Sequence, residues 1–291
     1  MDLFRKNYEL SPNPPKALDF DSYSKIAQEK YSELLERGNT SEKDFQDFFE
    51  QNPSFIPGSY ELLGHSGHSP FMCTLISQPE IGSMVRRKPD FMWLSGNSLY
   101  FCPVFVEIED PKKNMFNKDN TYTAKFNQAL QQIEEWQYIL EQSTAKSSFY
   151  ECYKIPLYEQ EKIFAPQFLL IYGRRSEYEG NNLLKGIRAQ KEKDNLRIMS
   201  FDRLRPDYES AQFTCCKVSN GEYNVISIPP TYRYGPDYAE SLSKMRGFYE
   251  KIDSIENISS NRKDFLKNRY NYWIKFSERE DIGIICGGDF E

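Results

Sequence analysis

The chain has 291 residues, of which 39% are apolar and 15% aromatic, and it carries a net charge of −6. This length provides one large domain or two small ones, and the acidic balance argues against a protein that coats nucleic acid through charge alone. The chain contains neither a transmembrane-length apolar run nor the apolar segment of a secretory signal, so we expect a cytoplasmic protein without membrane contact. Its six cysteines form no CxxC pair, which predicts free thiols in a reducing compartment.

The amino-terminal part predicts an arm followed by one short helix. Residues 1–20 include the proline-rich stretch SPNPPKALDF, so residues 1–40 are assigned to an extended arm. In TSEKDFQDFFEQNP, Ser41 is the expected N-cap, and three phenylalanines recur at helical spacing. Glu42 would lie in the first turn, where the helix dipole favours an anion.

Residues 54–80 are rich in glycine and proline and are interpreted as loops. Two histidines, His65 and His68, stand here in GHSGHSP. A zinc site would need Cys or carboxylate partners at ligand spacing, and the sequence offers none. We therefore interpret both as loop residues.

Alternating helices and strands predict an α/β core with a mixed sheet flanked by helices over residues 41–212. Strands are expected at 88–94 and 99–108, joined as a hairpin by a turn at Gly96–Asn97, and again at 167–172 and 196–201. Helices are expected at 123–141 and 182–193. A carboxyl-terminal element, 213–291, would comprise a hairpin in CKVSNGEYNVISIP and helices at 236–255 and 260–280. The apolar stripe of the last helix suggests packing or oligomerisation.

The strand VFVEIE, residues 104–109, raises a question of charge. Because strand side chains alternate between faces, Glu107 and Glu109 would share one face and repel each other. Burying two unpaired carboxylates is costly. A structural Lys or Arg, or a metal ion, should therefore lie between them.

A second carboxylate belongs to the same hairpin. If residues 96 and 97 form the turn, Asp90 and Glu107 lie at the same end and converge. Magnesium prefers hard oxygen ligands, commonly one or two carboxylates with water and substrate phosphate. The spacing therefore favours a site for Mg²⁺ or Mn²⁺ held by Asp90 and Glu107.

These residues resemble the PD-(D/E)xK nuclease signature, with Pro89-Asp90 followed by Glu107-x-Glu109. The lysine of that signature would fall at 109, where this chain has Glu. Together, SEKDFQDFFEQNP, RRKPDF, VEIEDPKKNMF and TAKFNQALQQIEEWQYIL are similar to the Shedu family of bacterial anti-phage nucleases. Later stretches, including FLLIYGRR, ISIPPTYRYGP and ISSNRKDFLKNRYNYW, extend this similarity over roughly residues 40–280.

The resemblance implies a restriction-endonuclease-like core that nicks or cleaves double-stranded DNA with magnesium, within a homo-oligomer such as a dimer or tetramer. Asp90 and Glu107 would bind the metal, and Glu109 is a further candidate ligand. Gln132 would lie beside the site, and Glu42 matches an acidic residue that some members contribute from the first helix. The positive charge that the signature lysine would supply at position 109 would come instead from Lys112, Lys113 or Lys125. Lys113 is favoured for its proximity to the motif.

Basic clusters flank the carboxylates and are expected to contact DNA phosphates: Arg86, Arg87, Lys88, Lys112, Lys125, Arg174 and Arg175. An alternative function is a non-cleaving nucleic-acid sensor or scaffold that kept the fold after losing the lysine. A glycosidase is disfavoured, because such enzymes place their two carboxyl groups across a cleft. A structural alternative also stays open, in which Glu107 and Glu109 only form salt bridges with nearby Lys or Arg.

Overall fold

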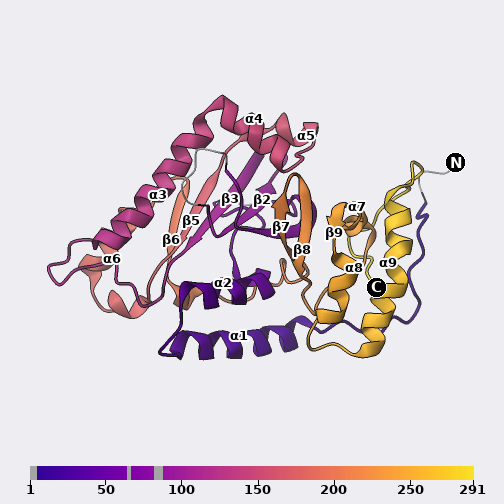
Figure 1. The fold of residues 1–291 in the computed structure, drawn as a ribbon, viewed down its shortest axis with the longest axis horizontal. Helices are drawn as coiled ribbons and strands as arrows, with labels where there is room; N and C mark the ends of the chain where they lie inside the picture. Colours follow the sequence, from indigo (N-terminus) through magenta and orange to yellow (C-terminus); the bar gives the residue numbers. More distant parts are fainter. Residues whose placement is uncertain (1–4, 64–66, 82–87) are drawn as a thin grey trace.

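The computed structural model describes residues 5–63, 67–81 and 88–291 and shows an α/β fold (Figure 1). A mixed nine-stranded sheet has the order β6-β5-β3-β2-β1-β7-β8-β9, and β4 pairs with β3 off this path. This confirms the predicted fold class. The strands are β1 (Thr74–Ser77), β2 (Phe91–Gly96), β3 (Tyr100–Ile108), β4 (Ile163–Phe164), β5 (Gln167–Ile171), β6 (Leu196–Met199), β7 (Thr214–Ser219), β8 (Glu222–Ser227) and β9 (Met245–Arg246).

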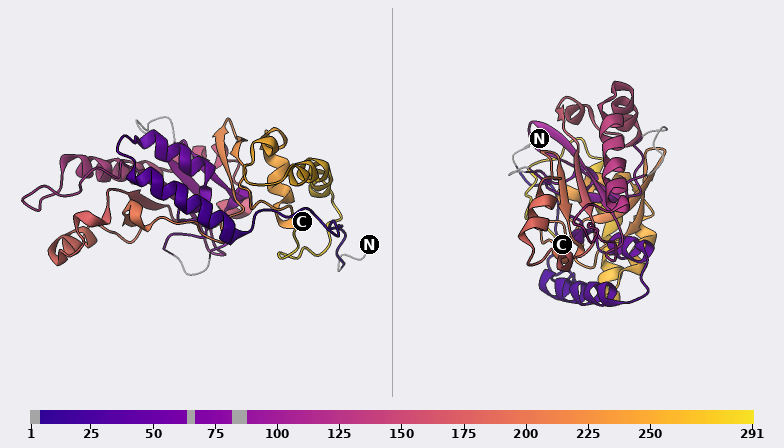
Figure 2. Two further views of the ribbon diagram at one scale, coloured as in Figure 1. Left: turned by 90° about the horizontal axis from the view of Figure 1, so that it is seen from below. Right: turned by 90° about the vertical axis from the view of Figure 1, so that its left-hand side faces the viewer.

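Helices cover both faces of the sheet, and the molecule is elongated, with α6 towards one end and α9 at the other (Figures 1 and 2). In the described part of the chain, every helix is too short or too polar to cross a membrane. The helices are α1 (Phe20–Glu36), α2 (Glu42–Gln51), α3 (Ala124–Glu141), α4 (Ser143–Cys152), α5 (Leu157–Gln160), α6 (Asn182–Ala189), α7 (Ala239–Lys244), α8 (Phe248–Lys251) and α9 (Ser260–Ser277).

The predicted hairpin is present as β2 and β3, which pair antiparallel with Phe91 opposite Val106 and Gly96 opposite Phe101. On its other side, β3 pairs parallel with β5, with Ile108 opposite Ile171. The start of β2 and the ends of β3 and β5 therefore meet at one end of the sheet. This geometry brings segments distant in sequence to one place.

Strand β3 buries both of its faces, as expected for a central strand. Val104, Val106 and Ile108 belong to the core beneath α1 and α2, whereas Phe105 belongs to the core beneath α3 and α4. The predicted alternation is therefore confirmed. Because Glu107 has the same parity as Phe105, its side chain lies on the α3 side of the sheet.

Helix α2 begins after its predicted N-cap, and α3 begins one residue after its predicted start. Ser41 is the N-cap of α2, and the Asp44 carboxylate accepts a hydrogen bond from the Ser41 backbone N–H at 2.7 Å. Thr123 is the N-cap of α3 and accepts a hydrogen bond from the Phe126 N–H. The expected apolar stripe of α3 is buried: Phe126, Ala129, Leu130, Ile133, Trp136 and Leu140.

The carboxyl-terminal part differs from the prediction. The hairpin of β7 and β8 is present, but it belongs to the main sheet, because β7 pairs parallel with β1. The single helix predicted over 236–255 is wrong: α7, β9 and α8 replace it, with a 3-10 turn before α7 and another after α8. Gly247 has a φ of +74°, which interrupts a helix, and β9 pairs with β8. The predicted boundary at residue 212 stays a prediction.

The last predicted helix is confirmed as α9, and its stripe contributes to the internal core. Leu266 and Trp273 are buried, and Tyr270 packs against the same cluster. The stripe therefore has a partner within the chain. The expected dimer or tetramer no longer depends on this face and stays a prediction.

Several elements were absent from the sequence-based prediction. Helix α1 lies in the segment assigned to the arm, where the described residues 5–19 and 37–40 lack helix and strand. Helix α4 was likewise not predicted. Strand β1 lies inside the region interpreted as loops, yet it occupies the centre of the sheet. The six cysteines are free thiols, as predicted.

Candidate functional site

Asp90 lies immediately before β2 and next to the end of β3. Its N–H donates to the Val106 carbonyl at 3.0 Å, and its Oδ2 accepts the Ile108 N–H at 2.8 Å. Extending the hairpin register by one residue places Asp90 opposite Glu107. The two carboxyl groups thus come together as the sequence predicts.

Glu107 is buried, with 8% of its surface exposed. Its Oε1 accepts a hydrogen bond from Gln132 Nε2 at 2.8 Å, so α3 contributes Gln132 to the site. Its Oε2 is buried without a hydrogen-bond partner among the described residues. An orphaned carboxylate oxygen of this kind is a position where a cation or a proton is expected.

The electrostatics show that these carboxyl groups disfavour charge in this setting. Burial raises the pKa of Asp90 from 3.8 to about 7, opposed by hydrogen bonds with the Ile108 N–H and the Glu107 side chain and reinforced by the charges of Glu42 and Glu109. Burial, together with the charge of Asp90, raises the pKa of Glu107 well above its usual range. At neutral pH the pair therefore retains protons or attracts a cation.

Glu109 lies next to this pair and has a cationic partner. Its Oε2 forms an ion pair with Lys113, whose Nζ also donates to Glu42 Oε1 on α2. Burial acts to lower the pKa of Lys113, but its hydrogen bonds with Glu109 and Glu42 outweigh burial and raise the pKa. Burial raises the pKa of Glu109, and Lys113 opposes the rise. Lys113 is therefore a charged lysine at the side of the carboxylate pair.

The loop that carries Lys113 is held by residues the sequence analysis did not select. Glu177 accepts the backbone N–H groups of Met115 and Phe116 at 2.9 and 2.8 Å. Gly173 has a φ of +60°, and a Cβ at this position would lie 2.7 Å from the Lys113 carbonyl oxygen. Only the glycine of FLLIYGRR, just after a predicted strand, could have signalled this close approach.

Gln46 on α2 is a further missed residue. Its Nε2 donates to Ser77 Oγ at 3.1 Å and lies 3.5 Å from the Asp90 carbonyl oxygen. Its Oε1 is buried without a hydrogen-bond partner in the described part of the chain. A glutamine on an amphipathic helix gives no signal in the sequence, because the same pattern describes an ordinary polar flank.

The predicted metal ligands differ in how they fit a cation. Among the described residues, no group of three or more His, Cys, Asp or Glu side chains is arranged to hold a metal ion. Asp90 and Glu107 offer two carboxylates and an orphaned oxygen, which suits magnesium because water and phosphate complete its shell. Glu109 and Glu42 bind Lys113 instead, so their roles as ligands stay predictions.

The basic residues predicted to contact DNA come from segments at the site's end of the sheet. Lys88 precedes β2, Arg174 and Arg175 follow β5, and Lys125 lies in the first turn of α3. Lys88 and Arg174 form ion pairs with Glu80 and Asp202, at 2.7 and 2.8 Å. Lys112 donates to the carbonyls of Gly38 and Thr40 at 2.8 and 3.2 Å, and Lys125 and Arg175 are exposed. Arg86 and Arg87 lie outside the described residues, as does His65 of the predicted loop.

Comparison with known families agrees with this arrangement. The family model described as "Shedu protein SduA, C-terminal" matches residues 39–204, more than half of the chain. The chain belongs to the Shedu family. The matched segment contains Asp90, Glu107, Glu109, Lys113 and Gln132, and membership implies a role in anti-phage defence. No curated protein and no solved structure matches the chain.

Proposed function

We propose that this Shedu protein is a magnesium-dependent endonuclease that nicks or cleaves double-stranded DNA in anti-phage defence in the cytoplasm. The observation that supports this most strongly is the buried pair of Asp90 and Glu107, on adjoining segments of one hairpin. The pair has raised pKa values and one orphaned oxygen. Buried like-charged carboxyl groups with perturbed pKa values are typical of functional sites.

Asp90 and Glu107 would hold the metal ion, which when bound polarises the phosphate and activates water. Gln132 orients Glu107 through the 2.8 Å hydrogen bond and thereby selects which oxygen faces the ion. In the reaction, a water oxygen bonds to phosphorus, one phosphorus–oxygen ester bond breaks, and the departing oxygen gains a proton. The chain must therefore orient a water molecule and balance negative charge that develops on the phosphoryl oxygens.

Lys113 is the cation that would perform this second task. It occupies the neighbourhood of Glu109, where the family signature has lysine, although it comes from the following loop. Its ammonium group carries three donors, and two of its partners, Glu109 and Glu42, are carboxylates. A phosphate with its metal ion would compete with them for the ammonium group. Basic residues around the sheet end would position the DNA backbone.

The test is conversion of supercoiled plasmid to open-circular or linear DNA, with magnesium or with EDTA. We expect magnesium-dependent conversion by the wild type and loss of at least about 100-fold in the isosteric variant Glu107→Gln. Glu240→Gln, which removes an exposed carboxylate from α7, is the matched control and should cleave like the wild type. Equal cleavage by Glu107→Gln and the wild type would overturn the proposal.

A further inference from the structure

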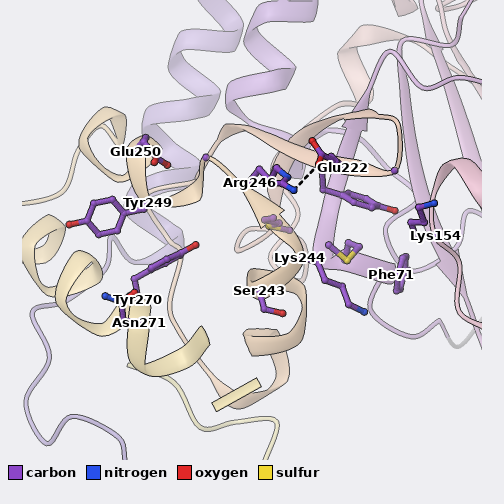
Figure 3. A pocket seen from close by; sticks show the side chains of 15 residues that line it. Phe71, Lys154, Glu222, Ser243, Lys244, Arg246, Tyr249, Glu250, Tyr270 and Asn271 are labelled. Carbon is purple, nitrogen blue, oxygen red and sulfur yellow. Dashed lines mark ion pairs between the residues drawn. The ribbon is translucent and has the colours of Figure 1, made fainter. Parts of the chain in front are cut away.

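A hollow of about 930 Å³ lies at the edge of the sheet formed by β8 and β9. Five separate segments surround it: the turn at Phe71, Lys154 in the turn after α4, the β7–β8 turn, the stretch from α7 to α8, and α9 (Figure 3). Most of its lining comes from residues beyond 204, outside the segment that matches the family. The hollow is also separate from Asp90 and Glu107, neither of which lines it.

Two pairs of aromatic rings stand on opposite sides of this hollow. Phe71 and Tyr223 form an edge-to-face pair with ring centroids 6.4 Å apart, and Tyr249 and Tyr270 form another at 5.6 Å. Figure 3 shows Phe71 on one side and the two tyrosines of α8 and α9 on the other. The Tyr223 hydroxyl donates to the Tyr153 carbonyl at 2.8 Å, which fixes that ring. Tyr223 is buried, so the rings that a ligand can reach are those of Phe71, Tyr249 and Tyr270. Aromatic surface of this kind favours a flat ring as the ligand.

Three cationic side chains and two carboxylates, Glu222 and Glu250, also line the hollow. Arg246 forms an ion pair with Glu222 at 2.7 Å. Lys244 forms one with Glu240, also at 2.7 Å, and lies 5.8 Å from the centre of the Phe71 ring.

Lys154 forms no ion pair with any residue that the structure describes. Its side chain passes close to Gly221: a Cβ at position 221 would lie 2.4 Å from Lys154 Cε. A cation held over a glycine beside an aromatic wall is suited to a phosphate group.

Met72 lines the hollow in an unfavourable backbone conformation, with a φ of +67°. For Met the left-handed region costs free energy, and such residues cluster at ligand-binding positions. Two other positive φ values here belong to ordinary turns. Lys154 (+51°) lies in the turn that ends α4, where its N–H donates to the Glu151 carbonyl. Asn220 (+53°) forms the β7–β8 turn with Gly221.

We propose that this hollow binds a nucleoside phosphate. The base would lie against the accessible aromatic rings, and Lys154, Lys244 and Arg246 would bind the phosphates. Its volume falls within the roughly 300–1,000 Å³ range of small-molecule sites, which favours a free nucleotide over a long strand. This site goes beyond the proposed nuclease function and does not depend on Asp90 and Glu107. A protein that fails to bind nucleotide would therefore leave the nuclease proposal intact, and one that fails to cleave DNA would leave the nucleotide-site proposal intact.

The test is calorimetric titration of the full chain with ATP in EDTA, which keeps divalent ions from the carboxylate pair. Adenosine, inorganic triphosphate and a single-stranded oligonucleotide are titrated beside it. We expect ATP to bind, and adenosine and triphosphate to bind at least about tenfold more weakly, because each satisfies only one half of the site. A rise in the melting temperature of the wild type with ATP should accompany binding.

Two variants locate the site. Lys154→Asn removes the cation and keeps a residue that tolerates positive φ, and Tyr249→Leu removes a ring and keeps apolar bulk. Each should weaken ATP binding at least about tenfold while melting cooperatively. Lys217→Asn, on an exposed position of β7, is the matched control for lost charge. No ATP binding by the wild type, undiminished binding in both variants, or binding of the oligonucleotide alone overturns the proposal.

Discussion

Replacing Asp90 with asparagine should stabilise the protein at alkaline pH, although it damages the candidate site. In the folded chain, burial raises the pKa of Asp90 from 3.8 to about 7. The folded state therefore holds a proton that the unfolded state releases between those two pH values. Asp90 destabilises the fold progressively as the pH rises through this window, and the cost is complete above about pH 7.

The size of the effect follows from the pKa difference. About three pKa units at 1.36 kcal/mol each correspond to roughly 4 kcal/mol if Asp90 acted alone. Because Asp90 and Glu107 titrate together, part of this cost belongs to the pair. The asparagine oxygen still accepts the Ile108 N–H that Asp90 Oδ2 accepts in the wild type. We therefore expect Asp90→Asn to raise the free energy of unfolding by about 2–4 kcal/mol at pH 8.

The assay is urea unfolding of both proteins from pH 4 to pH 8.5 in EDTA. The difference in unfolding free energy between Asp90→Asn and the wild type should grow with pH and level off near pH 7 to 8. Magnesium at pH 8 should stabilise the wild type and have little effect on the variant. Asp194→Asn, which neutralises an exposed aspartate, is the control and should change stability little at any pH. A pH-independent loss of stability in Asp90→Asn would refute this reasoning.

Three further predictions concern the neighbourhood of Lys113 and the assembly. Lys113→Met should lower plasmid cleavage at least about tenfold, whereas Lys217→Met, which removes an exposed lysine of β7 outside the predicted DNA-binding set, should retain most activity. Gly173→Ala should reduce cleavage by displacing the Lys113 loop, and Gly180→Ala, also at positive φ but without a close neighbour, should not. Light scattering at micromolar concentration should show a dimer or tetramer, and a monomer would contradict that expectation.

The parts of the site that the sequence predicts depend on local geometry. The sequence predicts the hairpin itself, but the turn lies at Asn97–Leu99 and not at Gly96–Asn97. With Gly96 paired to Phe101, the observed register places Asp90 opposite Glu107. Gln132 follows from a long, strongly periodic helix, whose buried face is determined by its apolar spacing. In both cases a short-range pattern decides where a side chain points.

Other features depend on tertiary contacts that leave weak local signals. The selection of Lys113 over Lys112 and Lys125 depends on a loop held by Gly173 and Glu177, far along the chain. Strand β1 has only four residues, so its alternation is too short to recognise, yet its neighbours β2 and β7 make it central. The helix predicted over 236–255 was wrong because pairing of β9 with β8 overrides local preference.

Helix α1 was missed although its signal is present. Its buried residues Tyr23, Ala27, Tyr31 and Leu34 recur at helical spacing, and the Asp19 side chain accepts the Ser22 N–H as an N-cap. Because prolines lie shortly before this helix, the whole segment was predicted as an extended arm. The aromatic side chain of Tyr31 then contributes to the core beneath α2, so this helix is part of the fold that supports the site.

The most direct test of the site is calorimetric titration of Mn²⁺ into the wild type and Glu107→Gln at pH 8, with both proteins shown to fold. Because Asp90 and Glu107 are the two proposed ligands, we expect one Mn²⁺ site in the wild type and at least about tenfold weaker Mn²⁺ binding in Glu107→Gln. Equal Mn²⁺ affinity in the two proteins would contradict the assignment. The carboxylate pair would then be a structural feature rather than a metal site.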